Sequence, residues 1–345
     1  MYKKVSLKAW RNFFKDRGIA QENLDQYMEY VRVLNKNNVP VIFEFEHLSK
    51  LLGIKQDILA SMINSPASFY RTFRIPKYRG GFREIDAPYP SLLGVQRWIY
   101  QNILKQQSVH SSVHGFVPKK SIITNAKKHV GKVAFLKIDL KDFFPSITIN
   151  WIINVFRELG YAQNVAYYLA ALCCYNSHLS QGAATSPYLS NIVSRHLDNR
   201  LSKLSKSYSL IYTRYADDLA FSGKYIPAKF IEIATKIINE CKFEVNKNKT
   251  ILSVGPGKRI LTGISIAEDK ICLPRYIKRA IKKEAYYIVK FGYFSHASKN
   301  KIRNPFYLES LYGKLQFWRN VEPDNETASF YIKKIKAILD VLNGS

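Results

Sequence analysis

The chain has 345 residues, of which 47% are hydrophobic and 14% aromatic, enough apolar material for two or three domains with buried cores. Lysine and arginine number 53 against 26 aspartates and glutamates, and the net charge of +27 indicates a polyanionic partner. Because there is no run of about 18 apolar residues and no apolar signal core at the N-terminus, we expect no membrane association, and nucleic acid is the favoured partner. The four cysteines form no CxxC pair, so we expect reduced thiols and a cytoplasmic protein.

The N-terminal part of the chain is expected to be helical up to residue 65 and then to form a hairpin. Apolar side chains recur every three to four residues over residues 24–34, which is the period of an amphipathic helix. Residues 70–88 are expected to form two strands joined at an Arg-Gly-Gly turn over residues 79–81. A helix over residues 91–108 and a buried apolar strand over residues 133–140 follow.

The remaining elements surround a pair of adjacent aspartates, Asp217 and Asp218, which stand between two apolar strands. These strands are expected over residues 210–216 and 219–223. Helices are expected over residues 146–160 with Gly160 as the stop, 163–175, 186–205 following Pro187, and 226–241. Strand segments are expected at 243–246, 249–254 and 259–267, and from residue 274 the chain is helical, basic and aromatic. This order predicts an α+β fold with helical segments at both ends.

Three carboxylates suggest a metal site. Asp139 ends an apolar strand, where a core residue would not be charged. Asp217 and Asp218 repel each other unless water screens them or a divalent cation binds between them. If both strands are neighbours in one antiparallel sheet, the three side chains converge and offer the hard oxygen ligands that Mg²⁺ prefers. The alternative is three solvated aspartates, two of them in a surface turn.

Three ordered blocks carry a resemblance to a known family. They are FLKIDLKDFFPSI over residues 135–147, LSQGAATSP over 179–187 and YADD over 215–218. With this order and spacing, residues 70–265 resemble a reverse transcriptase, most closely the bacterial retron and group II intron branch. The resemblance implies a right-hand polymerase with fingers, an antiparallel palm sheet and a helical thumb. The expected domains are a helical N-terminal segment (1–65), fingers (66–132), palm (133–268, with interleaved fingers helices over 150–186) and an RNA-binding thumb (269–345).

The resemblance also implies site residues. Asp139, Asp217 and Asp218 match catalytic aspartates that hold two Mg²⁺ ions, with Mn²⁺ as a substitute, and Tyr215 matches the tyrosine beside the primer terminus. The implied deoxynucleotide-binding residues are Lys77, Arg83, Asp142, Phe143, Phe144, Gln181 and Lys249. For Asp142 and Phe143 the backbone N–H groups would meet the triphosphate, and Lys77, Arg83 and Lys249 would contact phosphates or protonate pyrophosphate.

Several of these residues have an ordinary alternative role. Phe144 matches the bulky residue that excludes a ribose 2′-OH, but core packing is the commoner role of phenylalanine. Gln181 could simply be the turn residue before Gly182. Lys247 is a close neighbour of Lys249 and competes with it for the proton-donor role.

Two short elements resemble those of retron enzymes in particular. Asn125-Ala126 followed by His129 resembles their NAxxH element, and Leu261-Thr262-Gly263 resembles their VTG element, with Leu in place of Val. A surface position on a helix is the alternative for His129. The chain also ends at residue 345, which leaves no room for RNase H, maturase or endonuclease domains, so the retron branch is favoured over group II intron proteins.

The C-terminal helices are predicted to bind RNA. Residues 275–303 contain nine lysines and arginines and one acid, Glu284, and cations of this density neutralise phosphates. The predicted RNA-binding residues are Asn125, His129, Thr262, Gly263, Arg275, Lys278, Arg279, Lys282 and Lys283. The aromatic residues Tyr286, Tyr287, Phe291, Tyr293 and Phe294 are interleaved with the cations. We expect most of these five in the core of the thumb, because aromatics at helical spacing usually pack inward.

The activity implied by the resemblance is specific. A retron reverse transcriptase copies part of a structured noncoding RNA, primes from a 2′-OH within it, and yields a branched RNA–DNA molecule, msDNA. The implied partners are this RNA, its cDNA, dNTPs, an effector protein and a host RNase H, and the implied role is anti-phage defence. The alternatives are a related bacterial reverse transcriptase of the group II intron or abortive-infection type, and a non-catalytic RNA-binding scaffold on the same fold.

Overall fold

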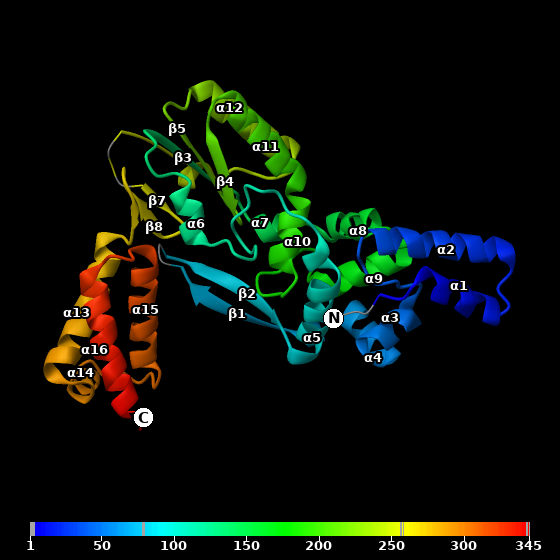
Figure 1. Ribbon diagram of the computed structural model, residues 1–345, viewed down its shortest axis with the longest axis horizontal. Helices are drawn as coiled ribbons and strands as arrows, with labels where there is room; N and C mark the ends of the chain where they lie inside the picture. Colours follow the sequence, from blue (N-terminus) through cyan, green and yellow to red (C-terminus); the bar gives the residue numbers. More distant parts are fainter. Residues whose placement is uncertain (1–3, 78–79, 256, 258, 343, 345) are drawn as a thin grey trace.

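The structure is a computed structural model and describes residues 4–77, 80–255, 257, 259–342 and 344 (Figure 1). Its N-terminal helices confirm the helical pattern expected up to residue 65. They are α1 (Leu7–Asp16), α2 (Gln21–Lys36), α3 (Phe45–Leu52) and α4 (Gln56–Asn64). The apolar side chains of residues 24–34 lie on α2 and are buried, as their spacing predicts. Helices α1 and α2 form the end of the molecule opposite the C-terminal helices.

The expected hairpin is present. After a 3₁₀ turn, η1 (Pro66–Phe69), strands β1 (Tyr70–Pro76) and β2 (Phe82–Pro88) pair antiparallel along their whole length. Gly80 and Gly81 have φ of +88° and +77°, which only glycine adopts readily, while Arg79 lies outside the described residues. Helix α5 (Pro90–Asn102) and a 3₁₀ turn, η2 (Leu104–Gln106), confirm the helix expected next.

Within the described chain, a four-stranded antiparallel sheet of order β4-β5-β3-β6 separates two hydrophobic cores. Its strands are β3 (Ala134–Asp139), β4 (Ile211–Tyr215), β5 (Asp218–Gly223) and β6 (Ile251–Val254). Leu136 and Phe221 belong to the larger core, whereas Phe135 and Ala220 belong to the smaller one. Because strand side chains alternate between faces, Lys137, Asp139 and Asp218 share the face of the smaller core.

Seven α-helices lie between α5 and β6 in chain order, some against the sheet and some, such as α8 and α9, against other helices. They are α6 (Ile122–Lys127), α7 (Phe143–Ser146), α8 (Ile149–Glu158), α9 (Gln163–Cys173), α10 (Ser186–Val193), α11 (Arg195–Ser207) and α12 (Ala228–Glu240). Figure 1 shows α11 and α12 lying along the sheet. Gly160, with φ of +98°, follows the end of α8 and confirms the expected stop.

Two of the expected helices are divided. The helix predicted over residues 146–160 begins only at Ile149, because Ile147 accepts a backbone hydrogen bond from Leu179 and is extended. The helix predicted over residues 186–205 is interrupted at Ser194, where ψ is 1°. Serine and the preceding β-branched Val193 are weak helix formers, so an interruption of the helix there costs little free energy.

The strands after α12 differ from expectation. Residues 243–246 form no strand but only a bridge from Val245 to Leu140, and residues 247–249 form a 3₁₀ turn, η3 (Lys247–Lys249). The predicted strand 259–267 is instead a hairpin of β7 (Arg259–Leu261) and β8 (Ile264–Ile266), to which a short unpredicted strand, β9 (Ile271–Cys272), is added. Thr262 and Gly263 form its turn with φ of +47° and +84°, the signs of a two-residue primed turn.

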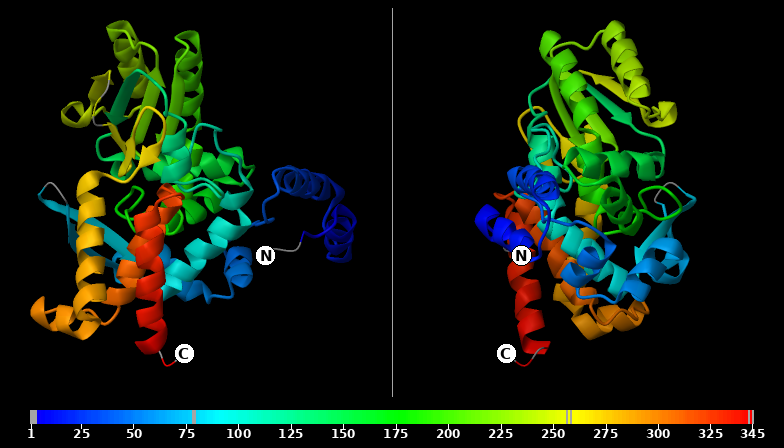
Figure 2. Two further views of the ribbon diagram at one scale, coloured as in Figure 1. Left: turned by 60° about the vertical axis from the view of Figure 1, so that its left-hand side comes forward. Right: turned by 90° about the vertical axis from the view of Figure 1, so that its right-hand side faces the viewer.

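The C-terminal region is helical, as expected. It comprises α13 (Arg275–Phe291), α14 (Tyr293–Lys299), α15 (Tyr307–Val321) and α16 (Glu326–Leu342). Their buried side chains form the smaller core with β7, β8 and the near face of the sheet. Figure 2 shows α13 and α16 extending away from the four-stranded sheet. No helix among the described residues is long and apolar enough to cross a membrane.

Candidate active site

The three predicted aspartates meet at one end of the four-stranded sheet. Asp139 is the last residue of β3 and pairs in register with Asp218, the first residue of β5. Asp217 stands in the β4–β5 turn, and its carbonyl accepts the N–H of Leu140 at 3.0 Å. Tyr215, the last residue of β4, is the register partner of Asp218. Two sequence regions about eighty residues apart are thus joined by strand pairing, as the carboxylate pattern predicted.

Two lysines pair with these carboxylates. Lys249 Nζ lies 3.0 and 3.3 Å from the two carboxylate oxygens of Asp139, which selects it over Lys247 as the lysine at the aspartates. Its backbone turn is fixed because Asn246 donates its N–H to the Asp139 carbonyl at 2.8 Å. Lys137 Nζ lies 2.7 Å from Asp218 Oδ1. Sequence reasoning missed Lys137, although its position two residues before Asp139 places it on the same strand face.

The electrostatics of the turn favour a bound cation. Burial, with the neighbouring Asp218 and Asp139 carboxylates, raises the pKa of Asp217 to about 6. Burial also raises the pKa of Asp218, and the ion pair with Lys137 opposes that rise. The positive charges of the two lysines therefore do not neutralise the negative charges of the three carboxylates.

The oxygen atoms available to a metal ion at this turn belong to carboxylates, two of which are already paired with lysines. In the part of the chain that the structure describes, no three His, Cys, Asp or Glu side chains are arranged as a metal-binding group. Asp139 and Asp218 are instead held by their lysines. The chemistry nevertheless fits a hard divalent cation, because the donors are carboxylate oxygens, and the pKa of Asp217 is raised by burial and by the neighbouring carboxylates Asp218 and Asp139.

A buried ion pair holds the aspartate turn. Arg214 on β4 is fully buried, and its guanidinium forks onto both oxygens of Asp198 at 2.7 Å each. The same guanidinium donates to Asn191 Oδ1 at 3.1 Å and to the Ala216 carbonyl at 3.2 Å. Ala216 has φ of +54°, a conformation that a non-glycine residue rarely adopts. The arginine therefore fixes the backbone immediately before Asp217.

A second segment packs against the same turn. Ser112 and His114 exchange backbone hydrogen bonds with Arg214 at 2.9 and 2.7 Å. Gly115 then passes so close that a Cβ there would lie 2.9 Å from the Ala216 backbone nitrogen. Glycine is required at this position because the two backbone segments pass so close to each other, and not because of its own φ angle.

His129 is buried, contrary to the surface position considered for it. Its side chain lies across the two paired strands that carry the turn, with Nδ1 2.7 Å from Ser222 Oγ on β5 and Nε2 2.7 Å from Thr213 Oγ1 on β4. Burial lowers the pKa of His129 to about 3, so the ring is neutral. Ser222, Ala220 and Asp218 lie on one face of β5. The histidine therefore packs on the same face of the sheet as Asp218, farther along the strands from the end where the aspartates meet.

The other residues of the two retron-like elements differ in burial. Asn125 on α6 is fully buried, and within the described chain neither atom of its amide has a hydrogen-bond partner. Thr262 is half-buried, with a buried hydroxyl that likewise finds no partner among described residues, whereas Gly263 is exposed. Asn125 and His129 are therefore both buried in this structure, and RNA binding by them stays a prediction.

Asp142, Phe143 and Phe144 belong to the first of the three sequence blocks and follow Asp139 closely in the chain. Asp142 has φ of +43° and precedes the single turn of α7. Phe143 is buried against Phe243, with ring centroids 5.6 Å apart. Phe144 is only partly buried, and its ring faces Phe116 at 6.5 Å, so it is less enclosed than a core residue.

The remaining residues that are predicted to bind the nucleotide lie on the β1–β2 hairpin and in the loop that contacts it. Gln181 accepts the N–H of Asp86 on β2 through its carbonyl at 2.9 Å, and Gly182 passes so close to β2 that a Cβ there would meet the Asp86 carbonyl oxygen at 2.5 Å. Lys77 and Arg83 are exposed on the hairpin. Arg83 pairs with Ile75, so Lys77, two residues further on, lies on the same face. These two cations belong to a different sheet from the aspartates.

The cations predicted on α13 are mostly free to meet a polyanion. Arg275, Arg279, Lys282 and Lys283 are exposed, whereas Lys278 is half-buried and pairs with Glu322 at 3.2 Å. The expected core position of the aromatics is wrong for four of the five. These are Tyr286, Tyr287, Phe291 and Phe294, with 43%, 41%, 54% and 72% of their surface exposed. The amphipathic stripe of α13 is instead filled by Ile281, Ala285 and Ile288.

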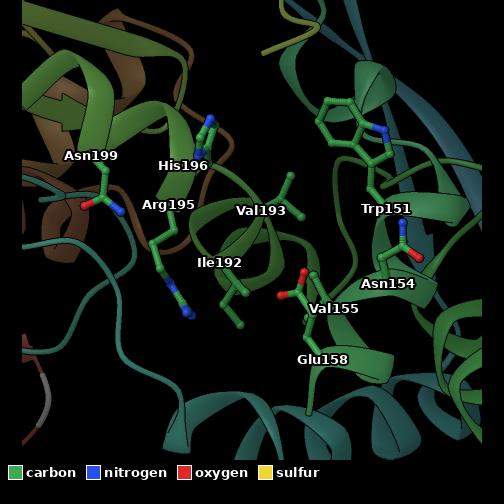
Figure 3. Close-up of a pocket in the computed structure, with 9 residues that line it drawn as sticks. All are labelled: Trp151, Asn154, Val155, Glu158, Ile192, Val193, Arg195, His196 and Asn199. Atoms are coloured by element: carbon green, nitrogen blue, oxygen red, sulfur yellow. The ribbon is translucent and has the colours of Figure 1, made fainter. Parts of the chain in front are cut away.

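One hollow lies apart from all of these residues. It measures about 360 Å³ and lies between α8 and the α10–α11 pair. Figure 3 shows Arg195 and Glu158 reaching toward it from opposite sides. None of the residues predicted for catalysis or nucleotide binding lines it.

Comparisons with known proteins agree with the sequence blocks. A family model described as reverse transcriptase (RNA-dependent DNA polymerase) matches residues 75–284. Retron Ec86 reverse transcriptase of Escherichia coli is 34% identical over 266 residues, which cover 75% of this chain and 83% of that protein. Retron Mx65 reverse transcriptase of Myxococcus xanthus is 36% identical over 282 residues, covering 75% of this chain and 66% of that protein. Among solved structures, apo telomerase from Candida tropicalis matches 82% of this chain and 60% of its own, with 13% identity and a TM-score of 0.46.

Proposed function

The chain belongs to the retron reverse transcriptases, a bacterial branch of the RNA-dependent DNA polymerase family, and from this premise we propose the reaction that it performs. It copies part of a structured noncoding RNA, starting from a 2′-OH within that RNA, and releases a branched RNA–DNA molecule. The observation that carries the proposal is the meeting of Asp139, Asp217 and Asp218 at one sheet end, with Lys249 on Asp139.

The carboxylates are the proposed metal ligands. Asp139, Asp217 and Asp218 would hold two Mg²⁺ ions, for which Mn²⁺ could substitute. When bound, such ions activate a sugar hydroxyl and stabilise the leaving pyrophosphate. The Arg214 network holds the turn that presents Asp217 and Asp218, so these ligands are fixed before any ion arrives.

The chain's own cations would handle the phosphates. Lys249 sits beside Asp139 and is half exposed, so it can protonate the departing pyrophosphate. Lys77 and Arg83 share one hairpin face and would hold the triphosphate as the hairpin approaches the sheet. The backbone N–H groups of Asp142 and Phe143 are the proposed additional triphosphate donors.

The neighbouring rings and the glutamine would select the substrate. The partly buried Phe144 would exclude a ribose 2′-OH, and Tyr215 would lie against the primer terminus. Gln181 would contact the incoming deoxynucleotide, since its loop is locked onto the hairpin through Asp86. The division into fingers (66–132), palm (133–268) and thumb (269–345) is proposed on the same grounds.

The biological setting is also part of the proposal. The template is a dedicated noncoding RNA, the cytoplasmic host RNase H trims it behind the enzyme, and an associated effector protein links the product to anti-phage defence. The family membership and a net charge of +27 support the nucleic-acid partners, and the RNase H and the effector protein are proposed from the family resemblance alone.

A second candidate is a related reverse transcriptase with another priming route. It is favoured by one observation: the buried His129 and Asn125 do not offer the retron-type RNA contact expected of them. The aspartate end of the sheet would serve either enzyme.

The nucleic acid that co-purifies with the protein, expressed from its native locus, distinguishes these candidates. It is treated with RNase A, then with debranching enzyme, and run on a denaturing gel. A discrete DNA whose mobility shifts on debranching is expected. A discrete DNA without a shift would favour the second candidate, and bound RNA with no DNA would contradict both.

A further inference from the structure

A pocket of about 660 Å³ opens between the end of α13, α14 and the start of α15. The end of α13 that carries its lining residues points away from the four-stranded sheet (Figures 1 and 2). The aromatic residues that line it are Tyr287, Phe291, His296 and Tyr307. None of the predicted catalytic residues borders this pocket, which we call the thumb pocket.

The rings of the thumb pocket form a platform of nearly parallel faces. Tyr287 and Phe291 lie 5.9 Å apart at an interplanar angle of 22°, and Tyr287 and His296 lie 6.4 Å apart at 19°. His296 in turn lies 6.0 Å from Tyr307 at 23°. Tyr287 and Phe291 keep about half of their surface exposed, so flat faces remain open to solvent. Such faces stack on nucleobases whatever their sequence.

The polar groups of the thumb pocket complement the rest of a nucleotide. Lys283 and Lys299 line it, are exposed, and are in no ion pair with any described residue. Glu284 also lines it and pairs with Lys314 at 3.3 Å. Two free cations suit a phosphate, and a carboxylate whose charge is already shared can accept an N–H from a base edge.

We infer that the thumb pocket captures one unpaired nucleotide of the bound RNA. The base stacks on Tyr287 and Phe291, its amino or imino edge donates to Glu284, and the flanking phosphates lie against Lys283 and Lys299. This inference rests on the proposed function for the presence of RNA, but not on its priming chemistry.

The pocket lies toward the far end of α13. Tyr287 stands twelve residues after Arg275, the first residue of the helix. At 1.5 Å per residue this separation is about 18 Å along the helix axis. A base held there belongs to a loop or single strand, because the bases of a duplex are already paired and stacked.

The test compares two neighbouring tyrosines in the full-length protein. Tyr286 and Tyr287 are equally exposed on α13, but only Tyr287 lines the pocket. Fluorescence anisotropy measures binding to a single-stranded RNA of roughly 12 nucleotides and to a blunt RNA duplex of the same length. Tyr287→Leu is expected to weaken binding of the single strand by about tenfold and to leave duplex binding within twofold, while Tyr286→Leu changes neither.

A second variant covers the case in which Tyr287→Leu does not fold. Lys299→Glu is a surface change and should weaken single-strand binding more than duplex binding. The inference is overturned if both pocket variants bind the single strand as wild type does, or if they lose single strand and duplex equally. The nucleic acid that co-purifies with the wild-type protein from its native locus is analysed for DNA in parallel. Absence of DNA there would refute the proposed function while leaving the binding comparison valid.

Discussion

His129 is expected to act as an internal support of the aspartate turn rather than as an RNA ligand. It hydrogen-bonds Thr213 and Ser222 at 2.7 Å each, and all three groups are buried. Replacing it with leucine leaves both hydroxyls without a partner, at a cost of about 1–3 kcal/mol each. His129→Leu should therefore lower the free energy of unfolding by about 2–6 kcal/mol, measured by urea denaturation followed by circular dichroism.

A matched variant separates lost hydrogen bonds from lost packing. Adding Thr213→Val and Ser222→Ala to His129→Leu removes the stranded hydroxyls, so the combined variant should regain at least half of the lost stability, because replacing all partners by apolar groups is close to neutral. RNA affinity of the folded His129→Leu protein should stay within about twofold. The support role is refuted if the combined variant is no more stable than His129→Leu, or if RNA affinity collapses with the unfolding midpoint unchanged.

Three further outcomes are expected. Lys249→Gln should lower kcat by about a hundredfold, the loss typical of one proton donor, and Lys247→Gln should leave it within threefold; equal losses in steady-state primer extension would contradict the assignment. Gly115→Ala should lower kcat at least tenfold with near-normal RNA binding, because the added Cβ would sit 2.9 Å from the Ala216 nitrogen; unchanged kcat would show that the turn tolerates displacement. The pKa of His129 is lowered by burial from 6.5 to about 3, so the unfolded chain binds a proton that the folded one does not. Stability should thus be lost as pH falls below 6.5, by roughly 2 kcal/mol at pH 5, and His129→Leu should reduce that loss in urea melts.

Where the sequence pattern was periodic, it predicted the fold. The buried stripe of α2 and the apolar strand β3 follow directly from the spacing of their side chains. Strand pairing then brings Asp139 to Asp218, which the two separated motifs indicated because each ends or begins a strand.

Where tertiary contacts determine the local conformation or burial of a residue, the sequence pattern alone did not predict it. Thr262 is β-branched and suggests a strand, yet it occupies a left-handed turn position in the structure. The short helix α6 carries no long amphipathic pattern, so nothing in its sequence marks His129 as buried between two strands. On α13 the aliphatic residues, not the aromatics, pack inward, and periodicity alone could not distinguish the two sets.

The central claim is that DNA synthesis takes place at the three aspartates. The most direct test is extension of a DNA primer on an RNA template by wild type and by Asp217→Asn, with Mg²⁺ and with a chelator, alongside RNA-binding measurements on both proteins. We predict Mg²⁺-dependent extension by wild type, none by the variant, and RNA affinities within twofold of each other. A full-length cDNA made by Asp217→Asn would contradict the claim.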